Sequence, residues 1–231
     1  MRVGIHQPNY IPWLGYFHKI ASVDTFVFFD NVQMPIGKSF VSRNRIKTNS
    51  GELWLTVPTA RDSDGKPIAE TQIVPGNWPR KHLKSLETAY AGAVELKPVL
   101  ALLSAAIGEG RGSIADLNTR VIAALAEHLG YGHVRFLRAT EMGLQGDGAE
   151  TAHEILKRLG AKTYVTGTGT GTERTIDPAA LAGDGIAIEY LPKVYPEYPQ
   201  RHGSFLANLS IVDAILNCSA TGTRSLLATA A

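Results

Sequence analysis

The chain has little sulfur chemistry to offer. Its 231 residues include one cysteine, Cys218, so an intrachain disulfide is excluded and a cysteine-based zinc site would need other ligand types. No histidine lies near Cys218 in the sequence, and we expect a buried structural thiol rather than a nucleophile. This cysteine usage is typical of a reducing compartment, and we expect a cytoplasmic protein.

Long apolar runs and a large net charge are also missing. No stretch of about 20 apolar residues exists, so we expect no transmembrane helix, and His6, Pro8 and Asn9 interrupt any signal-peptide region. The formal net charge of +2 is too small to favour nucleic acid or an anionic membrane as partner. We therefore expect a small-molecule substrate, free or linked to a carrier or nucleotide. Nothing in the sequence indicates an oligomeric state.

The familiar catalytic signatures are absent as well. There is no G-x-S-x-G elbow, H-E-x-x-H, C-x-x-C or EF-hand loop. The run at 166–173, TGTGTGTE, has alternating glycines and no following lysine, so it is neither a dinucleotide fingerprint nor a P-loop. We expect it to form a loop at a strand end whose N–H groups can approach a phosphate. The sequence identifies no cofactor and demands no metal.

What is present is the pattern of an α/β protein. Residues 3–5 predict a short buried strand, 13–22 a helix, and 25–30 a second buried strand. Such a succession predicts a right-handed parallel βαβ unit. The pattern returns in the last hundred residues, where we expect further strands at 134–137, 163–165 and 186–191 and a helix at 150–159.

The middle of the chain differs from both ends. Residues 39–47 and 53–58 flank a turn and predict a β-hairpin, a further strand is expected at 68–74, and Asn77 and Pro79 open a helix. Helices are expected at 83–91, 96–107, 114–129 and, as an amphipathic end, 205–217; residues after Arg224 are expected to fray. We predict a single α/β domain, 1–231: a Rossmann-like, mostly parallel sheet with a β-hairpin extension and a helical insertion, about 78–130, serving as lid, subdomain or mere insertion.

The end of the first strand is the strongest candidate site. Ligands of α/β proteins bind at the carboxyl ends of parallel strands, and His6 lies there. His6 is a candidate base or phosphate ligand; the alternative is a histidine that caps the strand. The candidate binding residues around it are Gln7, Asn9, Trp13 and Tyr16.

Two further clusters follow along the chain. Asp30 ends the second strand at the same edge as His6, where it is a candidate to orient His6, bind a metal or hold a sugar hydroxyl; a strand-end turn is the alternative. In the hairpin, Arg43, Arg45 and Lys47 point one way and form a row of cations suited to a diphosphate or carboxylate. A solvated edge strand is the alternative there. Asn44, between the arginines, is also a candidate substrate residue.

The remaining candidates lie later in the sequence. Lys81 and His82 open a helix, where anions are favoured. Tyr198, Gln200 and His202 alternate along an extended segment and can face one cavity, with Asn208 and Asp213 on the next helix or its cap. His6, Asp30, His82 and His202 are chemically adequate metal ligands, but their spacing demands no metal.

Six segments together resemble the WbqC-like family. They are 6–17 (HQPNYIPWLGYF), 30–33 (DNVQ), 43–46 (RNRI), 54–58 (WLTVP), 81–82 (KH) and 198–213 (YPQRHG through NLSIVD). The resemblance runs from residue 3 to about residue 217. It departs from the family pattern at 217–220, where NCSA stands in place of the expected NEGP.

The resemblance implies a biosynthetic enzyme, because members are typically encoded with genes for O-antigen, capsule, modified-sugar or specialised-metabolite pathways. It implies a transferase that moves an acyl or aminoacyl group to an amino sugar or related amine. We expect His6 or His202 as its general base, with the arginines holding a phosphate or carboxylate. A nucleotidyl-transfer or adenylate-forming Rossmann-like enzyme is one alternative, although the paired histidines of H-x-G-H are absent. A non-catalytic module that binds a sugar nucleotide or a carrier protein is the other.

Overall fold

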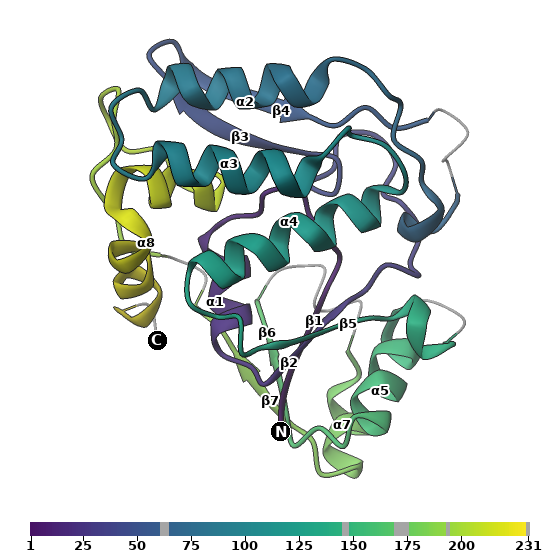
Figure 1. The fold of residues 1–231 in the computed structure, drawn as a ribbon. Helices are drawn as coiled ribbons and strands as arrows, with labels where there is room; N and C mark the ends of the chain where they lie inside the picture. Colours follow the sequence, from purple (N-terminus) through teal and green to yellow (C-terminus); the bar gives the residue numbers. More distant parts are fainter. Residues whose placement is uncertain (61–64, 145–147, 169–175, 193–194, 230–231) are drawn as a thin grey trace.

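The core of the protein is a sheet of five parallel strands. A computed structural model describes residues 1–60, 65–144, 148–168, 176–192 and 195–229. The strand order is β5-β2-β1-β6-β7 (Figure 1), which confirms the predicted Rossmann-like parallel sheet. The strands are β1 (Arg2–His6), β2 (Thr25–Phe28), β5 (Arg135–Arg138), β6 (Thr163–Thr166) and β7 (Ala187–Tyr190).

The strand order reverses between β1 and β6. The chain first builds outward from β1 through β2 to β5 and then returns to add β6 and β7 on the other side of β1. Such a reversal leaves a crevice outside the carboxyl ends of the two central strands, where ligands of this fold class bind. The crevice between β1 and β6 is therefore the first place to look for a site.

Helices cover the sheet on both faces. Right-handed crossovers place α1 (Leu14–Ala21) and the later α5 (Gly148–Arg158) and α7 (Pro178–Gly183) on opposite faces. In Figure 1, α5 and α7 lie together, away from α1, which packs against the C-terminal α8 (Ile211–Thr229). A short 3₁₀ turn, η3 (Thr140–Met142), follows β5.

A second layer lies beyond the carboxyl ends of the strands. It consists of the antiparallel hairpin β3 (Arg43–Thr48) and β4 (Gly51–Thr56), together with α2 (Trp78–Ala89), α3 (Leu96–Ile107) and α4 (Ile114–His128) (Figure 1). The predicted hairpin and helical insertion are confirmed. Helix α3 packs between α2 and α4, and buried side chains of both layers belong to one core cluster.

Two predicted elements are wrong. The strand expected at 68–74 is a 3₁₀ turn, η2 (Ile68–Glu70), followed by isolated bridges, because its backbone N–H groups donate to separate loops rather than to one neighbouring strand. The last helix does not end near 217 and fray after Arg224. It continues to Thr229 through a kink at Ser219, and Leu227 is buried.

Within the described ranges, none of the helices combines the length and apolar character needed to cross a bilayer.

Candidate functional site

The loop between β1 and α1 is clamped from behind by distant elements. Asn44 of β3 donates from Nδ2 to the Ile11 carbonyl at 2.8 Å, and Asn118 of α4 donates to the Pro8 carbonyl at 2.8 Å. Ile11 has a φ of 35°, which is strained for a β-branched residue and persists only where the surroundings enforce it. The clamps therefore fix the position in which His6 and its neighbours are presented, and the Asn44 amide is committed to this backbone.

His6 presents an unprotonated nitrogen at the end of β1. Its Nδ1 lies 3.0 Å from the Gln7 carbonyl, and because a carbonyl can only accept, Nδ1 carries the hydrogen. Nε2 has no hydrogen-bond partner in the part of the chain that the structure describes. The ring packs edge-on against Tyr16 at 4.8 Å and Trp13 at 6.0 Å. Burial, aided by the charge of Lys19, lowers the His6 pKa to about 3, so the imidazole is neutral at physiological pH.

The neighbouring residues support this arrangement. Tyr16, which is buried, donates its hydroxyl to the Gln7 carbonyl at 3.0 Å. Asn9 is also buried, so it belongs to the interior of the loop. Trp13 is partly exposed and pairs with Ser210 in an isolated bridge. The rings of Trp13 and Tyr16 thus lie against His6, and Gln7 and Trp13 are partly exposed whereas Asn9 and Tyr16 are buried.

Lys19 was not among the sequence candidates, yet it is the most unusual group here. It lies on α1, is 5% exposed, and its Nζ donates one hydrogen bond, 3.3 Å long, to the Ile5 carbonyl. Burial lowers the Lys19 pKa to about 7. Its stem lies across Gly4, where an added Cβ would sit 3.1 Å from Lys19 Cγ. A glycine inside a strand marks such close approaches, and Gly4 was the available sequence signal.

The amine of Lys19 is buried near the carboxyl ends of β1 and β6. The His6 carbonyl accepts from Phe29 on the β2 side, and successive carbonyls of a strand point to opposite neighbours. The Ile5 carbonyl therefore points toward β6, just beyond Gly4↔Val165, the last paired position of β1 and β6. Lys19 Nζ thus lies where the two strands part, beside His6.

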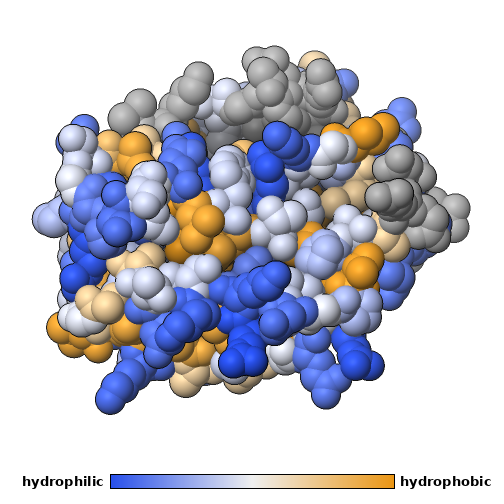
Figure 2. Space-filling view, turned by 90° about the horizontal axis from the view of Figure 1, so that it is seen from above, coloured by the Kyte–Doolittle hydropathy of each residue, from blue (hydrophilic) through white to orange (hydrophobic). Residues whose placement is uncertain are grey.

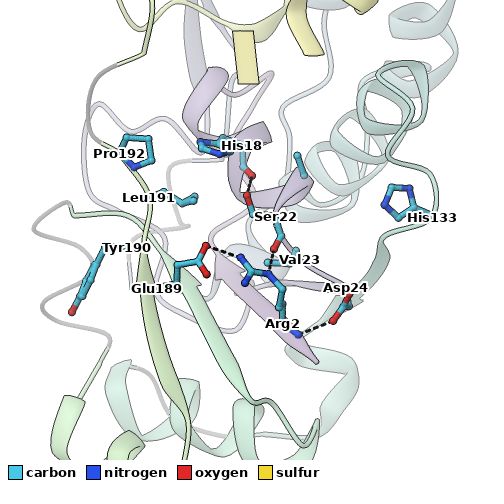
Figure 3. Close-up of a pocket in the computed structure, with 11 residues that line it drawn as sticks. Arg2, His18, Ser22, Val23, Asp24, His133, Glu189, Tyr190, Leu191 and Pro192 are labelled. Carbon is cyan, nitrogen blue, oxygen red and sulfur yellow. Dashed lines mark hydrogen bonds and ion pairs between the residues drawn. The ribbon is translucent and has the colours of Figure 1, made fainter. Parts of the chain in front are cut away.

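A separate cavity of about 510 Å³ lies along the flank of α1 (Figure 3). Its charges are already paired: Arg2 Nη2 lies 2.6 Å from Glu189, and the Arg2 backbone N–H donates to Asp24 at 2.7 Å. Figure 3 shows this ion pair reaching from β1 to β7 below His18. The cavity extends toward the starts of β1 and β2, and neither His6 nor Lys19 lines it. The groups that are available to react with a substrate, His6 and Lys19, lie at the crevice and not in this cavity.

Asp30 lies at the same sheet edge as His6, as predicted, but serves other partners. Its fully buried carboxylate accepts from Arg138 Nε at 2.6 Å and from the Thr140 hydroxyl at 2.9 Å. Arg138 also binds Asp116 of α4. Within the described residues Asp30 makes no hydrogen bond to His6; it ties the ends of β2 and β5 to α4.

The predicted row of hairpin cations exists, but its members differ. Arg45 bonds to Glu52 and to the Ala207 carbonyl. Lys47 is buried beneath the segment at 203–204, to whose carbonyls it donates. Arg43 stacks its guanidinium over Trp54, with Cζ 3.9 Å from the ring centroid. Among the described residues, Arg43 is the member of this row that makes no hydrogen bond or ion pair.

Lys81 and His82 separate at the start of α2. His82 is buried, with Nδ1 3.0 Å from the Tyr10 hydroxyl and its ring 5.2 Å from that of Trp78. Burial lowers the His82 pKa to about 4, so this imidazole is neutral and enclosed. Lys81 is exposed.

Three of the C-terminal candidates converge on one buried cluster. The Asp213 carboxylate, fully buried, accepts from Tyr90 at 2.7 Å and from Tyr198 at 2.8 Å. Gln200 accepts from Lys47 Nζ at 3.3 Å. Burial raises the Asp213 pKa, and the two phenols oppose that rise. The alternation of Tyr198 and Gln200 therefore does face one interior, the Asp213 cluster.

His202 and Asn208 lie at the surface instead. His202 Nε2 is 2.7 Å from the Ala89 carbonyl at the end of α2, and both residues have positive φ angles, 64° and 58°. In the described parts of the chain, no group of three or more His, Cys, Asp and Glu side chains could hold a metal ion. Burial raises the pKa of the Cys218 thiol. Most of the glycine–threonine run, 169–173, lies outside the described residues.

Comparison with known proteins identifies the family. The sequence profile of the WbqC-like protein family matches residues 7–225. The chain belongs to the WbqC-like family. It is similar to "Uncharacterized protein Rv1507c" of Mycobacterium tuberculosis (strain ATCC 25618 / H37Rv), with 30% identity over 224 residues that cover 95% of this chain and 94% of the relative. No solved structure matches the chain. Lys19 lies within the matched residues, and His6 immediately precedes them.

Proposed function

We propose that this WbqC-like protein is a cytoplasmic biosynthetic transferase with the β1–β6 crevice as its active site. It moves an acyl or aminoacyl group from an activated donor to an amino sugar or related amine, in a modified-sugar, polysaccharide or specialised-metabolite pathway. One observation carries the proposal: a neutral imidazole, whose Nε2 makes no hydrogen bond to any residue that the structure describes, lies beside a buried amine whose pKa is about 7.

These two groups suit attack by an amine on a carbonyl. The acceptor nitrogen forms a bond to the carbonyl carbon, the bond from that carbon to the leaving group breaks, and a proton leaves the nitrogen. His6 Nε2 accepts a hydrogen bond from the acceptor N–H and orients its lone pair; with a pKa of about 3 it does not keep the proton. Lys19, about half unprotonated near pH 7, takes the proton and returns it to the leaving group.

The test is amide formation from acyl- and aminoacyl-coenzyme A donors with glucosamine and galactosamine as acceptors, followed by mass spectrometry. We expect one donor–acceptor pair to react, and His6→Gln and Lys19→Met each to lower kcat/KM by about 10²-fold or more. His133→Gln, an exposed histidine, is the matched control and should match wild type. The proposal fails if no pair gives an amide, or if both variants keep wild-type turnover.

The strand order also favours a second candidate, a nucleotidyl-transfer or adenylate-forming enzyme, because nucleotides bind at the switch point of such sheets. This candidate requires ATP or another nucleoside triphosphate to bind at the crevice. Calorimetry with the four common triphosphates separates the two. Binding with release of pyrophosphate on addition of an acid substrate would favour it, binding without any turnover would favour a sugar-nucleotide or carrier module, and no binding at millimolar concentration removes it.

A further inference from the structure

We propose that an aromatic strip leading from the crevice to the hairpin, formed by Trp13, Phe40 and Trp54, works with Arg43 to bind a phosphorylated ring compound. The ring lies against Phe40 and the phosphate against Arg43. The phosphorylated ring compound is a substrate of the transferase proposed above, and this assignment as substrate rests on that proposed function. The binding itself requires no turnover.

The strip is continuous in space. The ring centroids of His6 and Trp13 are 6.0 Å apart, those of Trp13 and Phe40 are 5.3 Å apart, and those of Phe40 and Trp54 are 6.1 Å apart. These rings come from the β1–α1 connection, the segment before β3, and β4. A ligand lying along the strip therefore reaches the crevice at one end and the hairpin at the other.

Arg43 ends the strip as a prepared oxyanion receptor. Its guanidinium face is occupied by Trp54, at 3.9 Å, which leaves the N–H groups along its edge. No carboxylate or carbonyl of the described residues accepts from them. An arginine held flat by an aromatic ring offers two parallel N–H groups to a phosphate at little further cost in conformational entropy. Arg45 also approaches Trp54, at 5.8 Å, but its donors bind Glu52 and Ala207.

Phe40 supplies the surface for the ring. It is 40% exposed, and the nearby chain position Ile36 is 76% exposed. Figure 2, which shows the molecule from above, has apolar patches between polar side chains. Aromatic rings stack on nucleobases, and likewise on the apolar face of a pyranose. A nucleoside phosphate and a sugar phosphate are thus the two sources of the same chemistry.

The experiment titrates the full chain with uridine 5′-monophosphate, glucose 1-phosphate, uridine and inorganic phosphate, followed by calorimetry and tryptophan fluorescence. We expect one of the two ring phosphates to bind at least about tenfold more tightly than uridine or phosphate alone. Arg43→Gln and Phe40→Ala should each weaken that binding about tenfold. Arg135→Gln and Tyr190→Ala, exposed residues on β5 and β7, are the matched controls and should bind as wild type.

Several outcomes would overturn the inference. They are no binding of either ring phosphate at millimolar concentration, phosphate alone binding as well as the ring compounds, or binding that Arg43→Gln leaves unchanged. The wild type distinguishes this inference from the proposed function. If it binds the ring phosphate, Arg43→Gln and Phe40→Ala weaken that binding, and no amide forms from any donor–acceptor pair, the strip is correct and the transferase is wrong.

Discussion

At the scale of the residue, Lys19 is a functional group held at a cost in stability. Its pKa falls from 10.5 to about 7 on burial, so between these two pH values the unfolded chain binds more protons than the folded one. The contribution of Lys19 to the free energy of unfolding should therefore rise from pH 7 toward pH 10, while buried tyrosines with raised pKa values act in the opposite direction near pH 10. Lys19→Met keeps the length and removes the charge. We expect it to be more stable than wild type at pH 7 by up to about 4 kcal/mol, and this difference should shrink toward pH 10.

Urea unfolding at pH 7, 8.5 and 10 measures this difference. Lys84→Met is the control, because Lys84 is an exposed lysine on α2 paired with Glu87, and its stability should follow the wild-type pH profile. If the free energies of unfolding of Lys19→Met and wild type change with pH in the same way, burial does not lower the pKa of Lys19.

Residue types in the sequence led to part of this site. His6, Trp13 and Tyr16 stand out because polar and aromatic groups follow a buried strand, and the structure brings their rings together. Lys19 could not be found in the same way, since a lysine in an amphipathic helix ordinarily extends to solvent. Its burial depends on a contact with Gly4 across two elements.

At the scale of the element, the kink in α8 is a strained hinge between two helical pieces. Ser219 has φ 69° and ψ 168°, a region essentially restricted to glycine, and such residues cost about 1–3 kcal/mol. Its hydroxyl accepts a long hydrogen bond, 3.3 Å, from Gly222. Replacing a serine cap by glycine costs only a few tenths of a kcal/mol, whereas glycine relieves the backbone strain. Ser219→Gly should therefore stabilise the protein by about 1 kcal/mol.

The measurement is thermal unfolding, where this gain corresponds to about 2–4 °C. Ser219→Ala is the matched variant: it keeps the strain and loses the cap, so its melting temperature should fall. If glycine lowers the melting temperature as much as alanine, the hydroxyl, and not the backbone, governs the kink.

Elements were predictable where the hydrophobic pattern alone decides them. The apolar runs at 3–5 and 25–30 became β1 and β2 because both faces of a parallel strand are buried. The segment 68–74 (IAETQIV) has apolar residues only at its two ends, and its backbone hydrogen bonds go to several loops. The extent of α8 depended on a serine in the left-handed half of φ space, which residue propensity does not foresee.

At the scale of the whole molecule, a buried polar cluster joins segments that are far apart in the sequence. Asp213 of α8 binds Tyr198 and also Tyr90 at the end of α2, and the Tyr90 hydroxyl accepts from the backbone N–H of Lys47 in β3. The sequence indicated the polar residues of 198–213. It could not indicate Tyr90 as their partner, because that contact depends on how α2 and α8 pack against the hairpin.

The cluster predicts coupled effects of Tyr90→Phe and Tyr198→Phe. Each removes one hydrogen bond to a buried carboxylate and should cost about 1.5–3 kcal/mol. The double variant should cost more than the sum at pH 7.5, because Asp213 then has neither phenol and the buried charge is poorly compensated. Losing the phenols raises the Asp213 pKa further, since they act to lower it, so protonation relieves the penalty as the pH falls.

Urea unfolding of the double-mutant cycle at pH 7.5 and pH 5 tests this coupling, with Tyr190→Phe, a half-exposed tyrosine of β7, as control. Additive losses of equal size at both pH values would mean that the two phenols act separately. A coupling energy that becomes smaller toward pH 5 would instead show that Tyr90 and Tyr198 share one ionised carboxylate, that of Asp213. Asp213 would then link α8, which packs on α1, to the hairpin that carries Arg43. The proposed substrate path runs between these two elements, so Asp213 would hold both of its ends in place.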